Sequence, residues 1–144
     1  MTDLSLRDLS KKLADVDICM LITRTEGGEL SGRPMSNNGQ VEYDGDSYHF
    51  TWEEARMVDD IERDKRVGLS FQAGRGPGGD RPFMMHVEGE AELIRDKAVF
   101  KEHWSEDIAK WFENGIDTPG IVLIKVHATR IHWWEGTEDG EVKV

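Results

Sequence analysis

The sequence contains few of the features that mark secreted, membrane-bound or disulfide-rich proteins. Its single cysteine, Cys19, excludes a disulfide within the chain and any zinc site built from cysteines. The longest apolar run, ICMLI at 18–22, is much shorter than the roughly 20 residues that cross a bilayer. The N-terminal stretch also lacks the charged-then-apolar layout of a signal peptide. We therefore expect a cytoplasmic protein without membrane contact, with Cys19 as a buried, inert thiol.

Basic residues are scarce as well. The chain has 18 lysines and arginines against 29 aspartates and glutamates, which gives a formal net charge of -11. Binding to a nucleic-acid backbone needs a basic face, and no stretch of this sequence supplies one. The charge balance therefore excludes a nucleic-acid partner. A small anionic ligand remains compatible with it, provided that a few arginines are concentrated in one place.

Motifs for metal binding and for common kinds of catalysis are missing too. The five histidines show neither H-E-x-x-H nor a paired i, i+4 spacing, and His127 and His132 are expected on opposite faces of a continuous strand. There is no G-x-S-x-G, and no activating base lies near Cys19 in the sequence. The glycine-rich GRGPGG at 74–79 matches no phosphate-binding loop and favours a flexible connection. We predict no metal site, and the sequence identifies no catalytic residue.

The apolar pattern itself predicts more strand than helix. Helical spacing is found over about 6–16, where Ser5 or Asp3 is the expected cap, over 53–64, and over 96–113. Apolar runs bounded by turn residues predict strands over 17–25, from the turn at 26–29 to about Met35, and over 47–52, 67–71, 83–94 and 121–136. Thr51 is placed to cap the second helix, with Glu53 and Glu54 in its first turn. The stretches 37–39 and 43–46 are expected to be turns, 73–82 irregular, and the acidic tail at about 137–144 frayed.

This order of elements predicts a mainly β fold with flanking helices. Several short strands follow one another through tight turns, and the helices are too few for regular βαβ alternation. A length of 144 residues, 38% of them hydrophobic, suits one domain over 1–144 with a substantial core. We therefore expect a mostly antiparallel barrel with its helices outside.

Two tryptophans and two arginines are candidates for a binding site. Trp133 and Trp134 must face opposite ways on a strand, so that one is expected in the core and the other on an interface or a ligand wall. Arg33 precedes Pro34, which holds it in an extended conformation. Arg56 lies near the start of the second helix, where free backbone N–H groups favour an anion. Taken by itself, Arg56 is placed to pair with Glu53, Asp59 or Asp60; taken together with Arg33, it is placed to form a forked clamp for a phosphate.

Four segments, in order and spacing, resemble the flavin-binding split barrels related to pyridoxamine-phosphate oxidase, most closely the general stress protein 26 branch. They are GRPM, YHFTWEEARMVDDIERDKRVGLSF, MMHVEGEAEL and LIKVHATRIHWWEG, and the likeness covers about 15–136. The resemblance implies a six-stranded antiparallel split β-barrel. It also implies a homodimer that holds FMN or FAD in two clefts at the subunit interface.

The resemblance also implies which residues contact the flavin. Arg33 would contact its phosphate or ribityl region, and Arg56 and Met57 would occupy the basic pair that grips the phosphate. The other implied contacts are Pro34, Met35 and Ser36 along the ring, Thr51 and Trp52 after the aromatic strand, Met84 where the second subunit approaches, and Trp133 or Trp134. Lysine is usual where Met57 stands, and the loss of one charge-assisted bond costs on the order of 1.5–3 kcal/mol.

The sequence leaves three functions open. The first is a flavin-dependent oxidoreductase acting on a small substrate that the sequence does not identify. The second is a non-catalytic flavin-binding or sensing protein, and the third a deazaflavin- or haem-related member of the same superfamily. Oxidation of vitamin B6 is not expected, because the Arg-x-His element of true pyridoxamine-phosphate oxidases is missing after the tryptophans.

Overall fold

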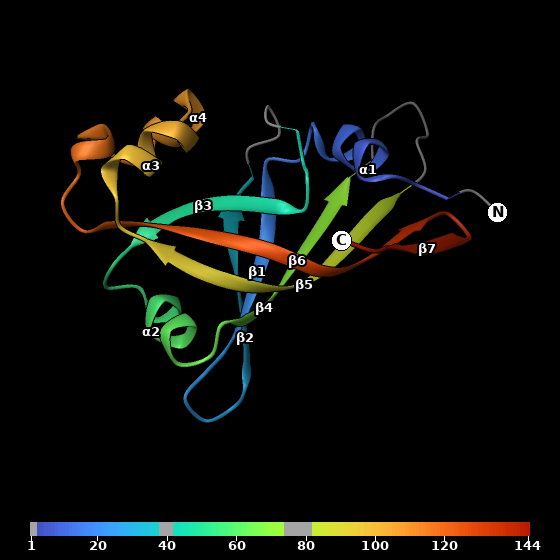
Figure 1. Cartoon of the computed structure of the whole chain (residues 1–144), viewed down its shortest axis with the longest axis horizontal. Coiled ribbons are helices and arrows are strands. Elements are labelled where there is room, and N and C mark those ends of the chain that lie inside the picture. Colours follow the sequence, from blue (N-terminus) through green and yellow to red (C-terminus); the bar gives the residue numbers. More distant parts are fainter. Residues whose placement is uncertain (1–2, 38–41, 74–81) are drawn as a thin grey trace.

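The structure is a computed structural model, and it describes residues 3–37, 42–73 and 82–144. Its centre is a sheet in which every neighbouring pair of strands is antiparallel, in the order β2-β1-β4-β5-β6-β3, with β7 beside β6 (Figure 1). The strands are β1 Ile18–Arg24, β2 Leu30–Ser36, β3 Asp46–Trp52, β4 Arg66–Ala73, β5 Phe83–Ile94, β6 Ile121–Glu135 and β7 Glu138–Val142. The six strands of the main path match the number that the family resemblance implies, and β7 is a seventh.

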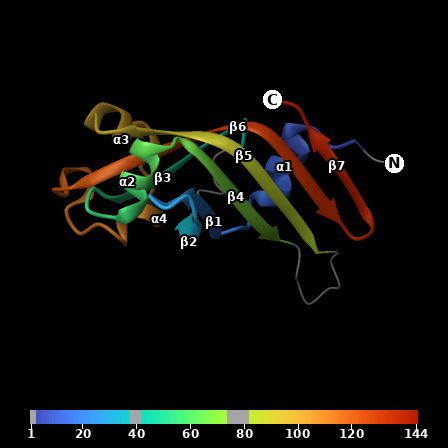
Figure 2. The same ribbon diagram turned by 90° about the horizontal axis from the view of Figure 1, so that it is seen from below.

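Helices lie outside this sheet, as expected. They are α1 Leu6–Leu13, α2 Arg56–Arg63, α3 Lys97–His103 and α4 Glu106–Ala109, with the short 3₁₀ turn η1 Gly115–Asp117. Figure 2 shows α1 at one end of the sheet, and α2, α3 and α4 toward the other. Helix α1 begins with a capping box, because the Ser5 side chain accepts from the backbone N–H of Asp8 while the Asp8 carboxylate accepts from that of Ser5. The chain therefore uses Ser5, rather than Asp3, as the cap.

The apolar side chains form two separate clusters. The main core contains residues from the inner faces of the strands together with α1 and α2, among them Leu9, Leu21, Leu69, Val87 and Trp133. A second, smaller cluster joins α3 and α4 to β6; its buried members are Phe100, Ile108, Phe112, Ile121 and Leu123. We call it the small core. Because Ile108 of α4 and Phe112 pack in the small core, this cluster helps to position the residues after α3 on the sheet.

Cys19 belongs to the main core, as predicted. Its thiol lies 3.6 Å from the carbonyl oxygen of Met35. Burial raises the pKa of this thiol to about 12. Cys19 is therefore protonated at neutral pH and has no nucleophilic character.

The second helix starts later than the sequence predicts. Thr51 does not cap it: Thr51 is buried in β3, paired with Val122 of β6. The N-cap is Ala55, which makes no side-chain capping bond. Glu53 remains outside the helix because its backbone N–H bonds to the carbonyl of Gly120, 2.7 Å away, and its carboxylate pairs with Arg95. Sheet pairing of β3 through Trp52 outweighs the helical preference of the two glutamates.

The predicted helix at 96–113 is also broken. Trp104 and Ser105 both have extended backbones, with ψ of 138° and 165°, and separate α3 from the single turn of α4. The break lets the chain turn back over β3, so that Trp104 packs edge-on against Phe50 with ring centroids 5.0 Å apart. Aromatic packing against the sheet therefore replaces a continuous helix.

A one-residue bulge changes the phase of β6. Glu88 pairs with Arg130, but Gly89 pairs with Ala128, so Thr129 is an extra residue on β6. As a result, His127 and His132 do not face opposite ways as predicted; both lie on the side away from the main core. Glycine is needed opposite the bulge, because a Cβ on Gly89 would lie 2.6 Å from the His127 carbonyl oxygen.

The acidic tail is not frayed over most of its length. Residues Glu138–Val142 form β7 against β6, and Gly140 lies close against the Trp133 ring. Glu141 pairs with Arg130, which offsets part of the acidic charge of the tail, and Asp139 hydrogen-bonds to His132. The expected turn at 26–29 is present, with Gly28 at φ 83°. Most of the predicted turn at 37–39 and of the glycine-rich segment at 73–82 lies outside the described residues.

Candidate functional site

A cleft of about 380 Å³ opens between β2, β3, the start of α2 and α4. This volume lies within the usual range for sites that hold small molecules. Its lining residues, which define the cleft from here on, are Ile18, Arg33, Pro34, Met35, Ser36, Asn37, Tyr48, His49, Phe50, Thr51, Trp52, Met57, Ser105, Ile108, Trp111 and Phe112. They come from β1, β2, β3, α2 and the segment around α4, and most of them are apolar or aromatic.

Arg33 occupies one end of the cleft. It lies in the middle of β2, an edge strand, where the missing N–H of Pro34 is tolerated. Its guanidinium donates to the Thr23 hydroxyl at 2.8 Å, to the Leu21 carbonyl at 3.3 Å and to the Ser31 hydroxyl at 3.2 Å. Burial lowers the pKa of Arg33, a shift that Asp60 opposes, yet an arginine of this kind stays protonated at neutral pH.

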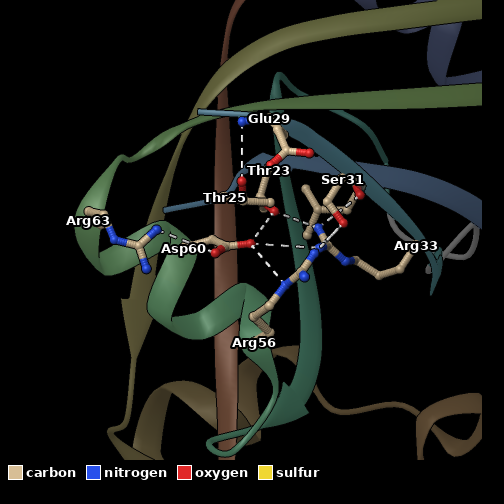
Figure 3. A network of polar contacts seen from close by, with 9 residues as sticks. Thr23, Thr25, Glu29, Ser31, Arg33, Arg56, Asp60 and Arg63 are labelled. Carbon is tan, nitrogen blue, oxygen red and sulfur yellow. Dashed lines mark hydrogen bonds and ion pairs between the residues drawn. The ribbon is translucent and has the colours of Figure 1, made fainter. Parts of the chain in front are cut away.

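Arg56 reaches the same place from the first residue of α2. Its guanidinium donates to the Ser31 hydroxyl at 2.6 Å, so Arg33 and Arg56 share one acceptor. Figure 3 shows both side chains converging there from different elements. Arg33 and Arg56, the two arginines that the sequence indicated, therefore lie next to each other. Arg56 remains largely exposed, which leaves part of its guanidinium open to solvent.

The two arginines surround one buried carboxylate. Asp60 is 1% exposed and accepts from the Thr23 hydroxyl at 2.9 Å. Arg33 and Arg56 each lie 3.9 Å from its carboxylate, and Arg63 lies at 3.5 Å (Figure 3). We call this group of three arginines around Asp60 the arginine end. Three positive charges face one negative charge there, so the arginine end attracts anions although the chain as a whole is acidic.

The floor of the cleft carries a fully engaged histidine. His49 is buried, with Nδ1 2.9 Å from the Ser36 carbonyl and Nε2 3.1 Å from the Ser47 hydroxyl. A carbonyl can only accept, so Nδ1 carries the proton and Nε2 accepts from Ser47. Burial lowers the pKa of His49, which is therefore neutral at pH 7. This ring fixes β2 to β3 and has no free nitrogen for a ligand.

Aromatic residues form another part of the cleft lining. Trp52 and Phe112 pack with ring centroids 5.0 Å apart, and Phe50 touches Phe112 edge-on at 6.4 Å. Trp52 and Trp111 remain exposed at 41% and 58%. We call Phe50, Trp52, Trp111 and Phe112, together with Ser105 and Ile108, the aromatic wall. Flat apolar surfaces of this kind favour a planar ring over an aliphatic chain.

The structure separates the predicted contact residues into three groups. Arg33, Pro34, Met35, Ser36, Thr51, Trp52 and Met57 line the cleft, and Arg56 stands at its arginine end. Met84 and Trp134 lie elsewhere, in a hollow of about 650 Å³ on the outer face of the sheet. Trp133 is 1% exposed in the main core, so of the two tryptophans Trp134 is the one at the surface.

Sequence reasoning missed the part of the aromatic wall that α4 supplies. Ser105, Ile108 and Trp111 were assigned to one continuous helix and given no contact with a site. A signal for the break was available, because Ser105 followed by Glu106 and Asp107 is a typical helix start. That signal would have placed a second helix after Trp104. It would not have shown which strand this helix covers.

The outer face of the sheet carries exposed apolar side chains. Ile18, Met20, Met84 and Trp134 line its hollow and are each at least 39% exposed. Ile18 also lines the cleft, so the hollow and the cleft meet at that residue. We call these four residues the outer apolar patch.

Two further kinds of site were searched for in the described ranges. Within 3–37, 42–73 and 82–144, no three histidine, cysteine, aspartate or glutamate side chains are grouped so that they would hold a metal ion. No helix in that part of the chain has the length and apolar character that a membrane crossing requires.

Comparison with known proteins identifies the fold. The structure is similar to a protein related to general stress protein 26 from Clostridium acetobutylicum, with a TM-score of 0.78, 18% identity, and coverage of 96% of this chain and 94% of that one. General stress protein 26 from Bacillus anthracis has a TM-score of 0.72 and 19% identity, with coverage of 94% of this chain and 98% of that one. A heme binding protein from Mycobacterium smegmatis has a TM-score of 0.76 and 14% identity, with coverage of 99% of this chain and 60% of that one. At these identities the likeness shows the fold, which is that of the split barrels.

The sequence comparisons give one decisive match. A search of curated proteins found no relative. In contrast, the model of the family described as "Pyridoxamine 5'-phosphate oxidase like" matches residues 5–144, which includes β1 to β7 and every lining residue of the cleft. The chain therefore belongs to the pyridoxamine 5'-phosphate oxidase-like family.

Proposed function

We propose that the chain binds a flavin, FMN or FAD, in the cleft and acts as a flavin-dependent oxidoreductase on a small substrate. The observation that carries this proposal is the shared Ser31 hydroxyl, which brings Arg56 to Arg33 beside a cleft that is also lined by aromatic side chains. A phosphate at the arginine end and a flat ring at the aromatic wall match the two ends of FMN.

The residues present fit such a group. The arginine end has more positive than negative charge, as a phosphate dianion requires, and Arg33 and Arg56 each offer N–H donors. Pro34, Met35 and Ser36 form one edge of the cleft, along which a ring could lie against the β2 backbone. Met57 also lines the cleft, in the place where the family usually has lysine. The phosphate would therefore depend on the arginines alone.

A bound flavin would supply hydride and one-electron chemistry. The chain would contribute binding, orientation and exclusion of water, because the described lining of the cleft includes no carboxylate, lysine or cysteine, and both ring nitrogens of its histidine, His49, are bonded. The alternative function is a non-catalytic flavin-binding or sensing protein. Reduction of the bound flavin by NADH or NADPH at a steady rate would support the oxidoreductase, and failure of both to reduce it would support the alternative.

Haem is the competing ligand, because one structural neighbour is described as a heme binding protein. The engaged His49 offers no free ring nitrogen to haem iron in this cleft, which removes the histidine ligand that many haem sites use. Hemin added to the purified protein is expected to give no spectrum of histidine-ligated iron. If hemin did give that spectrum in the wild-type protein and not in a His49→Asn variant, haem rather than flavin would be the ligand of the cleft.

We also propose that two copies pair through the outer apolar patch. Exposed apolar surface of this kind marks interaction sites, and the patch meets the cleft at Ile18, so that a flavin would lie at the edge of the interface. Met84→Glu places a charge in the patch and is expected to give monomers by light scattering. Val144→Glu, at an exposed position outside the patch, serves as the control and should leave the size unchanged. A Met84→Glu protein that stays dimeric would show that the patch is not the interface.

The central test is flavin binding. Freshly purified protein is expected to show yellow flavin absorbance or to bind added FMN, with mass analysis of released cofactor distinguishing FMN from FAD. Arg33→Ala should weaken FMN by tenfold or more, since it removes a charge-assisted bond. Met57→Lys, which restores the family's usual charge, should strengthen FMN by about as much. Arg7→Ala, an exposed arginine in α1, is the matched control.

Riboflavin separates the phosphate from the ring, because it lacks the phosphate. Arg33→Ala should leave riboflavin affinity unchanged. Colourless protein that binds neither FMN nor FAD would overturn the proposed function. An Arg33→Ala variant with unchanged FMN affinity would instead place the phosphate elsewhere.

A further inference from the structure

One hydroxyl at the aromatic wall has no partner. Within residues 3–37, 42–73 and 82–144, the buried side-chain polar atom without a hydrogen bond is Ser105 Oγ. A hydroxyl buried in this way is costly, because it has lost its bonds to water and gained none in return. Ser105 lines the cleft, so a ligand placed there could supply the missing bond.

The local backbone explains why the hydroxyl is left over. Ser105 is the N-cap of α4, and a serine at this position ordinarily accepts from a backbone N–H two or three residues later. Here the N–H groups of Ile108 and Ala109 both bond to the carbonyl oxygen of Ser105, each at 3.1 Å. The side chain therefore makes no capping bond. A serine has the usual cap position without performing the usual cap function.

The neighbouring tryptophan shows the same incompleteness. Phe112 is buried in the small core, whereas Trp111, one residue before it, is 58% exposed and lines the cleft. The Trp111 ring makes a cation–π contact with Lys110, whose ammonium lies 5.7 Å from the ring centroid. Packing of Ile108 and Phe112 in the small core holds the chain on both sides of Trp111, whose side chain stays largely exposed. A rigid, half-exposed indole at a cleft is well suited to contact a flat ring.

We propose that Ser105 and Trp111 together form a ring-recognition site. The Ser105 hydroxyl bonds a polar atom on the edge of a planar heteroaromatic ring, and Trp111 contacts the apolar surface of that ring. The ring belongs to the same molecule whose anionic group lies at the arginine end, so this inference rests on the proposed function. It adds two contact residues on α4 and assigns the ring, separately from the phosphate, to the aromatic wall.

The distinguishing experiment measures riboflavin and FMN binding by fluorescence titration together with the melting temperature of the flavin-free protein. Ser105→Ala is expected to weaken both ligands equally, by about fivefold to tenfold, as loss of one net hydrogen bond does. The melting temperature of flavin-free Ser105→Ala should stay the same or rise, because the substitution removes an unsatisfied polar group. Trp111→Leu should weaken both ligands to a similar degree.

Two controls give opposite patterns. Arg33→Ala should weaken FMN and spare riboflavin. Ser10→Ala loses a bond that is made in the folded protein, 2.7 Å from Ser10 Oγ to the Tyr43 N–H, so it should lower the melting temperature and leave both affinities unchanged.

The outcomes separate this inference from the proposed function. Riboflavin affinity that is unchanged in Ser105→Ala and Trp111→Leu, in a protein that still binds FMN, would overturn the ring-recognition site and leave the proposed function standing. A lowered melting temperature of flavin-free Ser105→Ala would also overturn it, by showing a structural hydroxyl. Wild-type protein that binds neither riboflavin nor FMN would overturn both.

Discussion

The arginine end and the aromatic wall are built by different forces. At the arginine end, the hydroxyls of Thr23 and Ser31 and the carboxylate of Asp60 all have partners within the chain. At the aromatic wall, rings pack on rings, and Ser105 Oγ has no partner. The arginine end is thus complete as a piece of folded structure, whereas the aromatic wall is not. Substitutions at the first should act mainly on stability and phosphate, and those at the second should separate stability from ring binding.

The largest effect is expected where packing holds the wall in place. Phe112→Ala removes a buried ring that touches Phe50, Trp52 and Trp104, and we expect it to lower the free energy of unfolding by about 3 kcal/mol. Trp111→Ala, one residue away and exposed, should change it by less than about 0.5 kcal/mol. Urea denaturation measures both. Equal losses of unfolding free energy would show that Trp111 supports the fold as much as Phe112 does.

A smaller effect is expected from the centre of the arginine end. Asp60→Ala leaves Arg33 partly buried without its counter-ion and frees the Thr23 hydroxyl. Breaking a buried ion pair costs about 3–5 kcal/mol, and we expect about 2–3 kcal/mol here because the arginines are partly in water. The loss should shrink in high salt, which screens the repulsion among the remaining arginines.

Its control is Asp59→Ala, at the exposed neighbouring position, which should be near neutral in stability. Salt should also distinguish the arginine end from the aromatic wall. The effect of Phe112→Ala, which involves no charge, should not depend on salt. An Asp60→Ala protein as stable as wild type would mean that the arginines do not depend on this carboxylate.

The smallest effect is expected from His49, which joins β2 to β3. Its pKa is lowered by burial, so between that value and the ordinary value of about 6.5 the unfolded chain binds a proton that the folded chain does not. The contribution of His49 to stability is therefore complete above about pH 6.5 and decreases as the pH falls below it. Urea denaturation from pH 7.5 to 5 should show this decrease, and His49→Asn should show less of it. An identical slope in both proteins would refute the assignment.

Much of the fold follows from the sequence because short-range patterns decide it. The alternation in SYHFTW is preserved as a strand whose even positions are half-exposed and whose odd positions, such as Ser47 and His49, are buried. The capping box at Ser5 depends on residues three apart, and the extended backbone of Arg33 agrees with the restriction that the adjacent Pro34 imposes. Where neighbours in the sequence determine the structure, the prediction is confirmed.

The misses arise where residues distant in the sequence decide. Glu53 stays out of α2 because of Gly120, 67 positions later by residue number, and Trp104 leaves the helix because of Phe50. The acidic tail joins the sheet with Glu141 paired to Arg130 and Asp139 bonded to His132, both residues of β6. No periodicity within a segment contains these contacts. The same holds for the aromatic wall, whose membership depends on which strand α4 covers.

The bulge at Thr129 bears on how this chain tolerates change in length. One additional residue in a strand ordinarily exchanges its two faces, so that every inward side chain beyond it turns outward. Here the surplus residue is absorbed opposite Gly89, and Trp133 stays inward while Trp134 stays outward. A side chain at Gly89 would close the space that absorbs it. The missing Cβ of one glycine therefore decides which of two adjacent tryptophans another molecule can meet.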